Sequence, residues 1–184
     1  TIIVNTVERA QALYDKICNI LDYSNRDIPS DIILFHSRFT AEDRKEKERI
    51  LKINKGRYPY IIISTQIIEV SIDVSCNIMY TEIAPLDSLA QRGGRLNRKG
   101  NNYIVNGMEQ IMYVYNTENF LPYAKKSQED MIEVINRTFS LINNEAVSYY
   151  IINEQLNFVY SGFQLGISNF LEYFKNASIF GNSP

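Results

Sequence analysis

The stretch Tyr60-Ile61-Ile62-Ile63-Ser64-Thr65-Gln66 decides the fold of this 184-residue chain. Its apolar residues are consecutive rather than alternating, which is typical of a strand covered on both faces, as in a parallel sheet. Four further apolar runs have the same character, at residues 2–4, 31–35, 78–80 and 111–115. Together these runs predict a five-stranded sheet.

Helical patterns separate the predicted strands. Asn5 and Glu8 form a capping pair that predicts the start of a first helix, followed by an apolar stripe of Ala10, Leu13, Ile17 and Leu21. Thr40 and Asp43 form a second capping pair, which opens a highly charged helix from Ala41 to about Lys52. Strands that alternate with helices favour right-handed crossovers, so we expect a three-layer α/β fold around a parallel sheet.

The pattern changes near residue 119, and we divide the chain into a lobe at residues 1–118 and a helical C-terminal extension at residues 119–184. A helical stripe runs through Met131, Ile135, Phe139 and Ile142, and aromatic helix-like segments follow at residues 147–160 and 163–175. The extension is either the start of an accessory domain or a helical cover on the sheet, and the sequence leaves both open.

Composition excludes several classes of protein. Hydrophobic residues make up 45% and charged residues 22%, which excludes a disordered chain. The apolar runs are strand-sized, so we expect no membrane contact and a cytoplasmic location. The net charge of −2 means that any nucleic-acid contact must come from a local cluster. Because the chain begins at Thr1 rather than Met, we expect it to be part of a longer polypeptide.

The stretch most informative about function is Gln91-Arg92-Gly93-Gly94-Arg95-Leu96-Asn97-Arg98. On a helix beginning near Asp87, Gln91, Arg95 and Arg98 would share one face, opposite Leu86, Leu89 and Leu96. Each glycine inside a helix costs about 0.5–1 kcal/mol, which is easier to justify where a phosphate or a backbone approaches closely. Phosphate recognition by guanidinium groups and a solvated basic face both remain open on this pattern.

The stretch resembles motif VI of superfamily 2 helicases, the arginine-finger helix of the second RecA-like lobe. Three further matches occur in order along the chain. Motif V is resembled by Ser64-Thr65-Gln66 together with Glu69 to Asp73. Motif IV is resembled by Val4-Asn5-Thr6, which ends the first strand. The third match is His36-Ser37-Arg38-Phe39, which ends the second strand. Each match lies at the carboxyl end of a predicted strand, where open α/β sheets bind ligands.

Three sequence motifs within residues 1–117 indicate one particular family of these helicases. Ser-Thr-Gln-x-x-Glu-x-Ser-x-Asp, the run from Ala84 to Leu89, and Gln-Arg-x-Gly-Arg-x-Asn-Arg are similar to the CRISPR-associated helicase–nuclease of type I interference systems. The segment Val74-Ser75-Cys76-Asn77 departs from this pattern, since the family more often continues with aspartates. This departure bears on the contacts expected beside the nucleotide and not on the assignment of motif V itself.

The resemblance implies a RecA-like parallel sheet and specific roles for residues near ATP. Arg95 and Arg98 would be arginine fingers that reach the γ-phosphate held by the other lobe. Gln91 would orient the nucleotide or the attacking water, and Asp73 would bind the ribose or couple to the fingers. The alternative for Asp73 is a helix cap or a surface carboxylate. The Mg²⁺ that accompanies ATP would have its ligands on the first lobe.

Nucleic-acid contacts are implied for Thr6, Ser37, Arg38 and Thr65, which would face a single-stranded DNA backbone. The expected partners are the first RecA-like lobe, a metal-dependent nuclease domain and a CRISPR RNA-guided surveillance complex. The chain contains no phosphate-binding loop and no Asp-Glu box, so we expect it to be inactive alone. Alternatives are a lobe of another superfamily 2 DNA or RNA helicase, and a non-motor RecA-like platform that binds nucleic acid.

Overall fold

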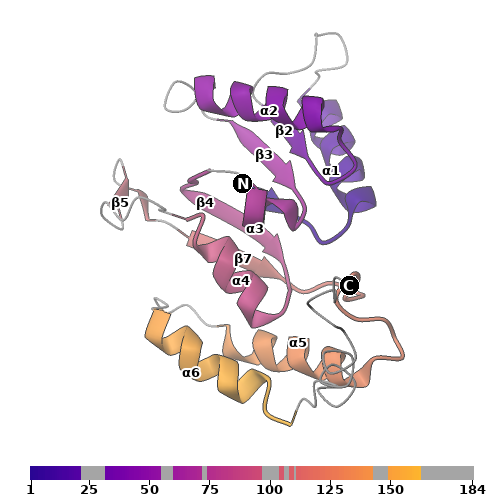
Figure 1. Ribbon diagram of the computed structural model, residues 1–184, viewed down its shortest axis with the longest axis vertical. Helices are drawn as coiled ribbons and strands as arrows, with labels where there is room; N and C mark the ends of the chain where they lie inside the picture. The colour runs from indigo at the N-terminus through magenta and orange to yellow at the C-terminus, as the bar shows by residue number, and fades with distance from the viewer. Residues whose placement is uncertain are drawn as a thin grey trace, which may run out of the picture.

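A five-stranded parallel sheet forms the centre of the molecule, in the order β2-β3-β1-β4-β7 (Figure 1). The computed structural model describes residues 1–21, 32–54, 60–71, 74–96, 104–105, 108–109, 111–142 and 149–162. The strands are β1 (Ile2–Ile3), β2 (Ile32–Phe35), β3 (Ile61–Ser64), β4 (Ile78–Glu82) and β7 (Ile111–Tyr115). Every pairing within this sheet is parallel. The predicted α/β class and all five predicted strands are confirmed.

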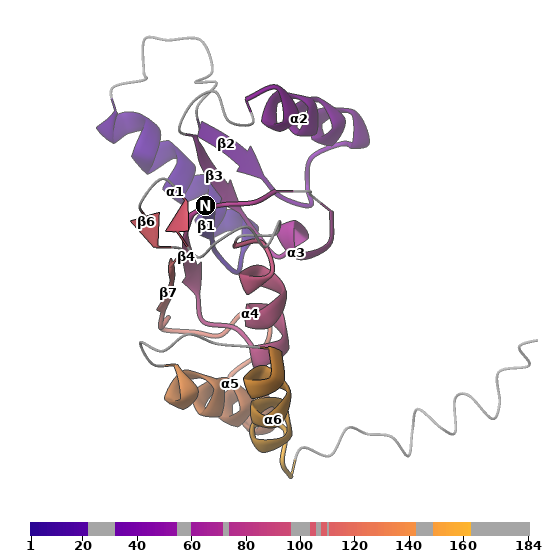
Figure 2. The same ribbon diagram turned by 90° about the vertical axis from the view of Figure 1, so that its left-hand side faces the viewer.

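Helices lie on both sides of the sheet, as the three-layer prediction requires (Figure 2). Helix α1 (Val7–Ile20) lies on one side, and α2 (Ala41–Asn54), α3 (Ile67–Ser71) and α4 (Leu86–Gly93) lie on the other. Two short strands, β5 (Ile104–Val105) and β6 (Met108–Glu109), pair antiparallel and were not predicted. Helices α5 (Glu129–Leu141) and α6 (Tyr149–Val159) follow β7.

Two of the hydrophobic core clusters lie on the sheet, one on each face. Ile3, Ile62 and Met79 are fully buried on the face that packs against α2 and α3. Ile63 and Val4 pack on the other face with residues of α1. Successive side chains of a strand point to opposite faces, so an uninterrupted run of isoleucines serves both clusters at once.

The prediction that every strand is covered on both faces is wrong for β4 and β7. Tyr80, Tyr113 and Tyr115 are 39%, 43% and 53% exposed. Their rings stack on one another, with centroids 5.1 Å apart for Tyr80–Tyr113 and 6.1 Å for Tyr80–Tyr115. The reason is that α1 packs over β2 and β3, and its cluster contains no residue of β4 or β7.

Helix capping follows the prediction in one helix and departs from it in another. The Asp43 backbone N–H donates to the Thr40 hydroxyl and the Thr40 backbone N–H donates to the Asp43 carboxylate, which confirms the capping pair at α2. At α1 the cap is Thr6, whose hydroxyl accepts from the Arg9 N–H at 3.3 Å. The expected cap, Asn5, is 1% exposed and is directed into the interior instead.

The described part of the extension packs against α4. Ile135 of α5 and Ala124 share a buried cluster with Leu89, and Val134 and Val159 share another with Leu86. Figures 1 and 2 both show α5 and α6 beside α4, at the opposite end of the sheet from α2. The boundary at residue 118 stays a prediction, and the segment at 163–175 lies outside the described residues. No helix in the described ranges is long and apolar enough to cross a membrane.

Candidate functional site

The predicted nucleic-acid residues gather along one edge of the sheet. Phe35 of β2 and Ile3 of β1 both pair in register with Ser64 of β3, so the three strands end together. The residues that follow these ends are Thr6, Ser37, Arg38 and Thr65. Their common edge is the one at which open parallel sheets bind ligands.

These four residues differ in their accessibility. Ser37 and Arg38 are exposed, whereas Thr65 is only 3% exposed. The Thr6 hydroxyl caps α1, as described above. The Arg38 guanidinium forms a salt bridge with the Glu8 carboxylate of α1, and both side chains are largely exposed. Of these four residues, Ser37 and Arg38 therefore have the most accessible hydrogen-bond donors.

The helix that carries the arginine motif is shorter than predicted. It begins at Leu86, close to the expected start at Asp87, but it ends at Gly93 with Gly94 as its C-cap. The prediction that Gln91 and Arg95 lie on one helical face is therefore wrong, because Arg95 lies beyond the helix. Among the described residues, no atom outside its own helix and chain neighbours would lie within 4 Å of a side chain at Gly93, so packing within the lobe does not require this glycine. The low helix propensity of two successive glycines explains why the helix stops there.

A buried arginine that the motif analysis above did not single out, Arg92, lies among the motif segments. It is fully buried, and its guanidinium donates five hydrogen bonds. The acceptors are the Glu69 carboxylate (2.9 Å), the Thr81 hydroxyl (2.6 Å), the Glu82 carbonyl (3.0 Å), the Asn5 amide oxygen (3.1 Å) and the Tyr123 hydroxyl (2.8 Å). A guanidinium has five N–H groups, so all its donors are used.

This arrangement, here called the Arg92 network, joins the motif segments to one another. Asn5 follows β1, Glu69 belongs to α3, Thr81 and Glu82 belong to β4, and Tyr123 lies between β7 and α5. An arginine that is buried but fully bonded fixes its neighbours in place, whereas the same group with a missing partner would be costly. The Arg92 network therefore holds motifs IV, V and VI in a defined relation.

Burial changes the ionisation of two members of the network. It raises the pKa of Glu69 above its ordinary value, and the Arg92 guanidinium opposes this shift. It also raises the pKa of Tyr123, so the phenol stays protonated and can accept from Arg92 while keeping its own proton. The Arg92 guanidinium thus favours the charged form of Glu69, which burial disfavours.

Arg95 is positioned by the same elements. Its backbone N–H donates to the Arg92 carbonyl at 2.8 Å, and its own carbonyl accepts from the Cys76 N–H at 3.0 Å. Its guanidinium donates to the Glu69 carbonyl. Arg95 is half-buried and Gln91 is exposed, so both lie where they can meet a ligand. The two remaining predicted site residues, Asp73 and Arg98, lie outside the described residues.

A signal for Arg92 was present in the sequence. Arg92 stands three residues after Leu89, which places it next to that leucine on the apolar side of the helix. A charged residue on such a face requires a buried partner. Choosing Glu69, Thr81 and Tyr123 as the partners needs the tertiary structure.

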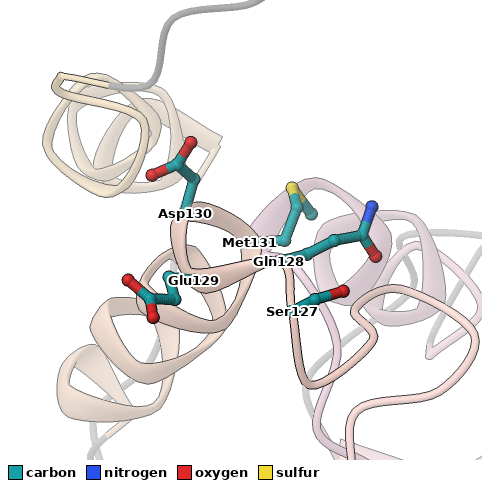
Figure 3. Close-up of a pocket in the computed structure, with 5 residues that line it drawn as sticks. All are labelled: Ser127, Gln128, Glu129, Asp130 and Met131. Atoms are coloured by element: carbon teal, nitrogen blue, oxygen red, sulfur yellow. The ribbon is translucent and has the colours of Figure 1, made fainter.

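A hollow of about 410 Å³ lies elsewhere, at the start of α5 (Figure 3). It is lined by five consecutive residues, namely Ser127, Gln128, Glu129, Asp130 and Met131. None of them belongs to the predicted site, and the two adjacent carboxylates would repel a phosphate. Across the described residues, no group of three or more His, Cys, Asp or Glu side chains is placed to hold a metal ion.

Comparison with known proteins decides the family. Residues 1–101 match the family described as CRISPR-associated nuclease/helicase Cas3, C-terminal. The chain belongs to the Cas3 family. A putative CRISPR-associated nuclease/helicase Cas3 of Methanocaldococcus jannaschii is 36% identical over 189 residues, covering 98% of this chain and 24% of the relative. The chain thus spans about a quarter of that Cas3 protein.

Solved structures agree on the fold. The crystal structure of T. fusca Cas3-ATP has a TM-score of 0.68 at 22% identity, covering 95% of this chain and 22% of that chain. A chain of a CRISPR RNA-guided surveillance complex, pre-nicking, has a TM-score of 0.65 at 22% identity, covering 96% of this chain and 23% of that chain. These structures show a RecA-like α/β fold, and the family match to the C-terminal helicase domain confirms the resemblance seen in the sequence.

Proposed function

We propose that this lobe is the second half of an ATP-dependent motor that translocates on single-stranded DNA during CRISPR interference. The observation that supports the proposal most directly is the fixed position of Arg95. Its backbone is bonded to Arg92 and Cys76, and its guanidinium donates to the Glu69 carbonyl of α3. A donor that is positioned before the reaction stabilises developing charge without a cost of reorganisation.

In this proposal Arg95 and Arg98 are arginine fingers that stabilise the charge on the γ-phosphate of ATP. Gln91 orients the nucleotide or the attacking water, and Asp73 binds the ribose or couples to the fingers. The first lobe holds the ATP phosphates and the Mg²⁺ that neutralises them. The relative solved as Cas3-ATP supports ATP as the nucleotide.

The DNA backbone would lie along Thr6, Ser37, Arg38 and Thr65. Hydroxyl and guanidinium groups contact phosphates without reading bases, which suits a motor that steps on any sequence. The exposure of Ser37 and Arg38 supports this assignment. For Thr65, which is buried and whose backbone N–H donates to the Phe35 carbonyl, the contact would require movement of the loop. The further partners proposed are a metal-dependent nuclease domain and an RNA-guided surveillance complex, which the pre-nicking relative supports.

The test is ATP hydrolysis by this lobe assembled with a first RecA-like lobe, with and without single-stranded DNA. We expect DNA-stimulated turnover that falls by about 10³–10⁵-fold in Arg95→Ala and in Arg98→Ala. The matched control is Arg49→Ala, which removes an exposed arginine of α2 that pairs only locally with Glu46. We expect the chain alone to be inactive.

Two outcomes would contradict parts of this proposal. Turnover that is indifferent to both arginines would leave a RecA-like binding platform without a motor function. Stimulation by single-stranded RNA rather than DNA would favour the alternative of an RNA helicase lobe.

A further inference from the structure

Tyr123 connects the extension to the motif segments of the lobe. It lies between β7 and α5, outside residues 1–101 that match the family. Its hydroxyl accepts from Arg92 at 2.8 Å, and its side chain also interacts with those of Gln66 and Ser88. Gln66 in turn donates to the Asn5 carbonyl at 2.8 Å. One phenol thus touches the segments of motifs V and VI and the body of α4.

The Tyr123 hydroxyl is one of the five acceptors that Arg92 requires. Arg92 is fully buried, so a donor that loses its acceptor has no access to water in its place. The same Nη2 atom also donates to the Asn5 amide oxygen at 3.1 Å. Loss of the Tyr123 hydroxyl would therefore leave one N–H of this nitrogen unsatisfied and allow the guanidinium to shift.

A shift of Arg92 would reach Arg95 by two routes. The first is the backbone, because the Arg92 carbonyl accepts from the Arg95 N–H at 2.8 Å. The second is Glu69, whose carboxylate binds the Arg92 Nε at 2.9 Å while its carbonyl accepts from the Arg95 guanidinium. Both anchors of Arg95 on this side thus depend on the position of Arg92.

We propose that Tyr123 is a positioning residue for the arginine finger, through which the extension that follows β7 controls the geometry of Arg95. The inference rests on the proposed function, because it assigns a consequence to the finger role of Arg95. Tyr123 touches neither nucleotide nor DNA in this scheme. It acts by completing the bonds of Arg92, and the packing of α5 on α4 holds it there.

The test compares two tyrosines that each join the extension to α4. Tyr123→Phe removes the hydroxyl that binds Arg92. Tyr160→Phe is the matched control, because its hydroxyl donates to the Asp87 carboxylate at 2.7 Å, whereas the five donors of Arg92 go to other acceptors. Both variants are assembled with the first lobe, and DNA-stimulated ATP hydrolysis is measured at a temperature well below the Tm of each protein.

We expect Tyr123→Phe to lower kcat by about tenfold and to change the KM for ATP less than twofold. The reason is that a displaced Arg95 would stabilise the transition state less, while the binding of ATP in the ground state would hardly change. Tyr160→Phe should keep kcat within twofold of wild type. Arg92→Lys, which keeps the charge but loses the fork of donors, should lower kcat as well. Adding Tyr123→Phe to Arg92→Lys should then cost much less than tenfold, because the bond is already lost.

The outcomes separate this inference from the proposed function. If Arg95→Ala abolishes turnover but Tyr123→Phe retains full kcat, even with a lowered Tm, the hydroxyl is structural and this inference alone is overturned. Equal losses of kcat in Tyr123→Phe and Tyr160→Phe would overturn it too, because docking of the extension would then matter rather than the bond to Arg92. Turnover unaffected by Arg95→Ala would overturn the proposed function together with this inference.

Discussion

Replacing Arg92 by alanine should be the most destabilising single change in the described part of the lobe. The substitution removes a guanidinium that is 0% exposed and leaves the Glu69 carboxylate, 8% exposed, without its cation. Breaking a buried ion pair by removing one partner typically costs about 3–5 kcal/mol. For a chain of this length each kcal/mol lowers the Tm by about 2–4 °C, so we expect a fall of about 6–20 °C.

The measurement is thermal unfolding followed by far-ultraviolet circular dichroism. The control is Arg49→Ala, which removes an arginine whose side chain is 61% exposed and whose pair with Glu46 is local. We expect the control to keep its Tm within about 2 °C of wild type. Because the total stability of a domain is only about 5–15 kcal/mol, Arg92→Ala could abolish folding. Thr81→Val therefore serves as a milder second variant, since it removes one acceptor of Arg92 and should cost about 1–3 kcal/mol.

The reasoning would be refuted by an Arg92→Ala protein that melts within 2 °C of wild type. That result would mean that the five hydrogen bonds of Arg92 balance its desolvation so closely that the network adds nothing to stability. A Thr81→Val protein as stable as wild type would point the same way. Arg92→Lys should lie between alanine and wild type, because it keeps the charge and loses most of the bonds.

Two further predictions concern the exposed side of the lobe. Hydrogen bonds from Thr40 lower the pKa of Asp43, so the stability that this carboxylate contributes is present above its unfolded-state pKa and is lost as the pH falls through the lower folded-state value. Thr40→Ala should therefore lower the Tm by about 2–4 °C at pH 7 and by less at acidic pH, and an equal loss at both values would contradict the capping assignment. Glu8→Gln should release Arg38 for phosphate and tighten single-stranded DNA binding by less than about fivefold, an effect that fluorescence anisotropy should detect at low salt and that high salt should erase. Unchanged or weaker binding would remove Arg38 from the proposed DNA-binding edge.

Much of the site could be predicted because it depends on the order of strands and on short motifs. Apolar runs gave the positions of the five strands, and parallel strands must end at a common edge, so the residues after them were bound to meet. The prediction failed where one helix was extended too far. Gln91 and Arg95 were assigned to one helical face, but Gly93 and Gly94 end α4 before Arg95.

The burial of Arg92 was also missed. A sequence motif does not distinguish an arginine that binds a ligand from one that is buried and hydrogen-bonded within the protein. Arg92 and Arg95 are three residues apart and equally charged, yet one is fully enclosed and the other is half-buried. The difference arises from the end of α4, since the chain turns at Gly94 and carries Arg95 away from the apolar face. Gly93 and Gly94 were a stop signal in the sequence, but they were interpreted as room for a phosphate or a backbone instead.

What the sequence alone determined is local or periodic: the strands, the charged second helix with its Thr40–Asp43 cap, and the family that the ordered motifs indicate. These features depend on neighbouring residues and on a fixed repeat, so the sequence contains them directly. Only the tertiary structure decided which polar groups surround Arg92, because Asn5, Glu69, Thr81 and Tyr123 are brought together from positions up to 118 residues apart. A buried guanidinium needs every acceptor in place at once, and that requirement is met only when the sheet, α4 and the extension have packed together.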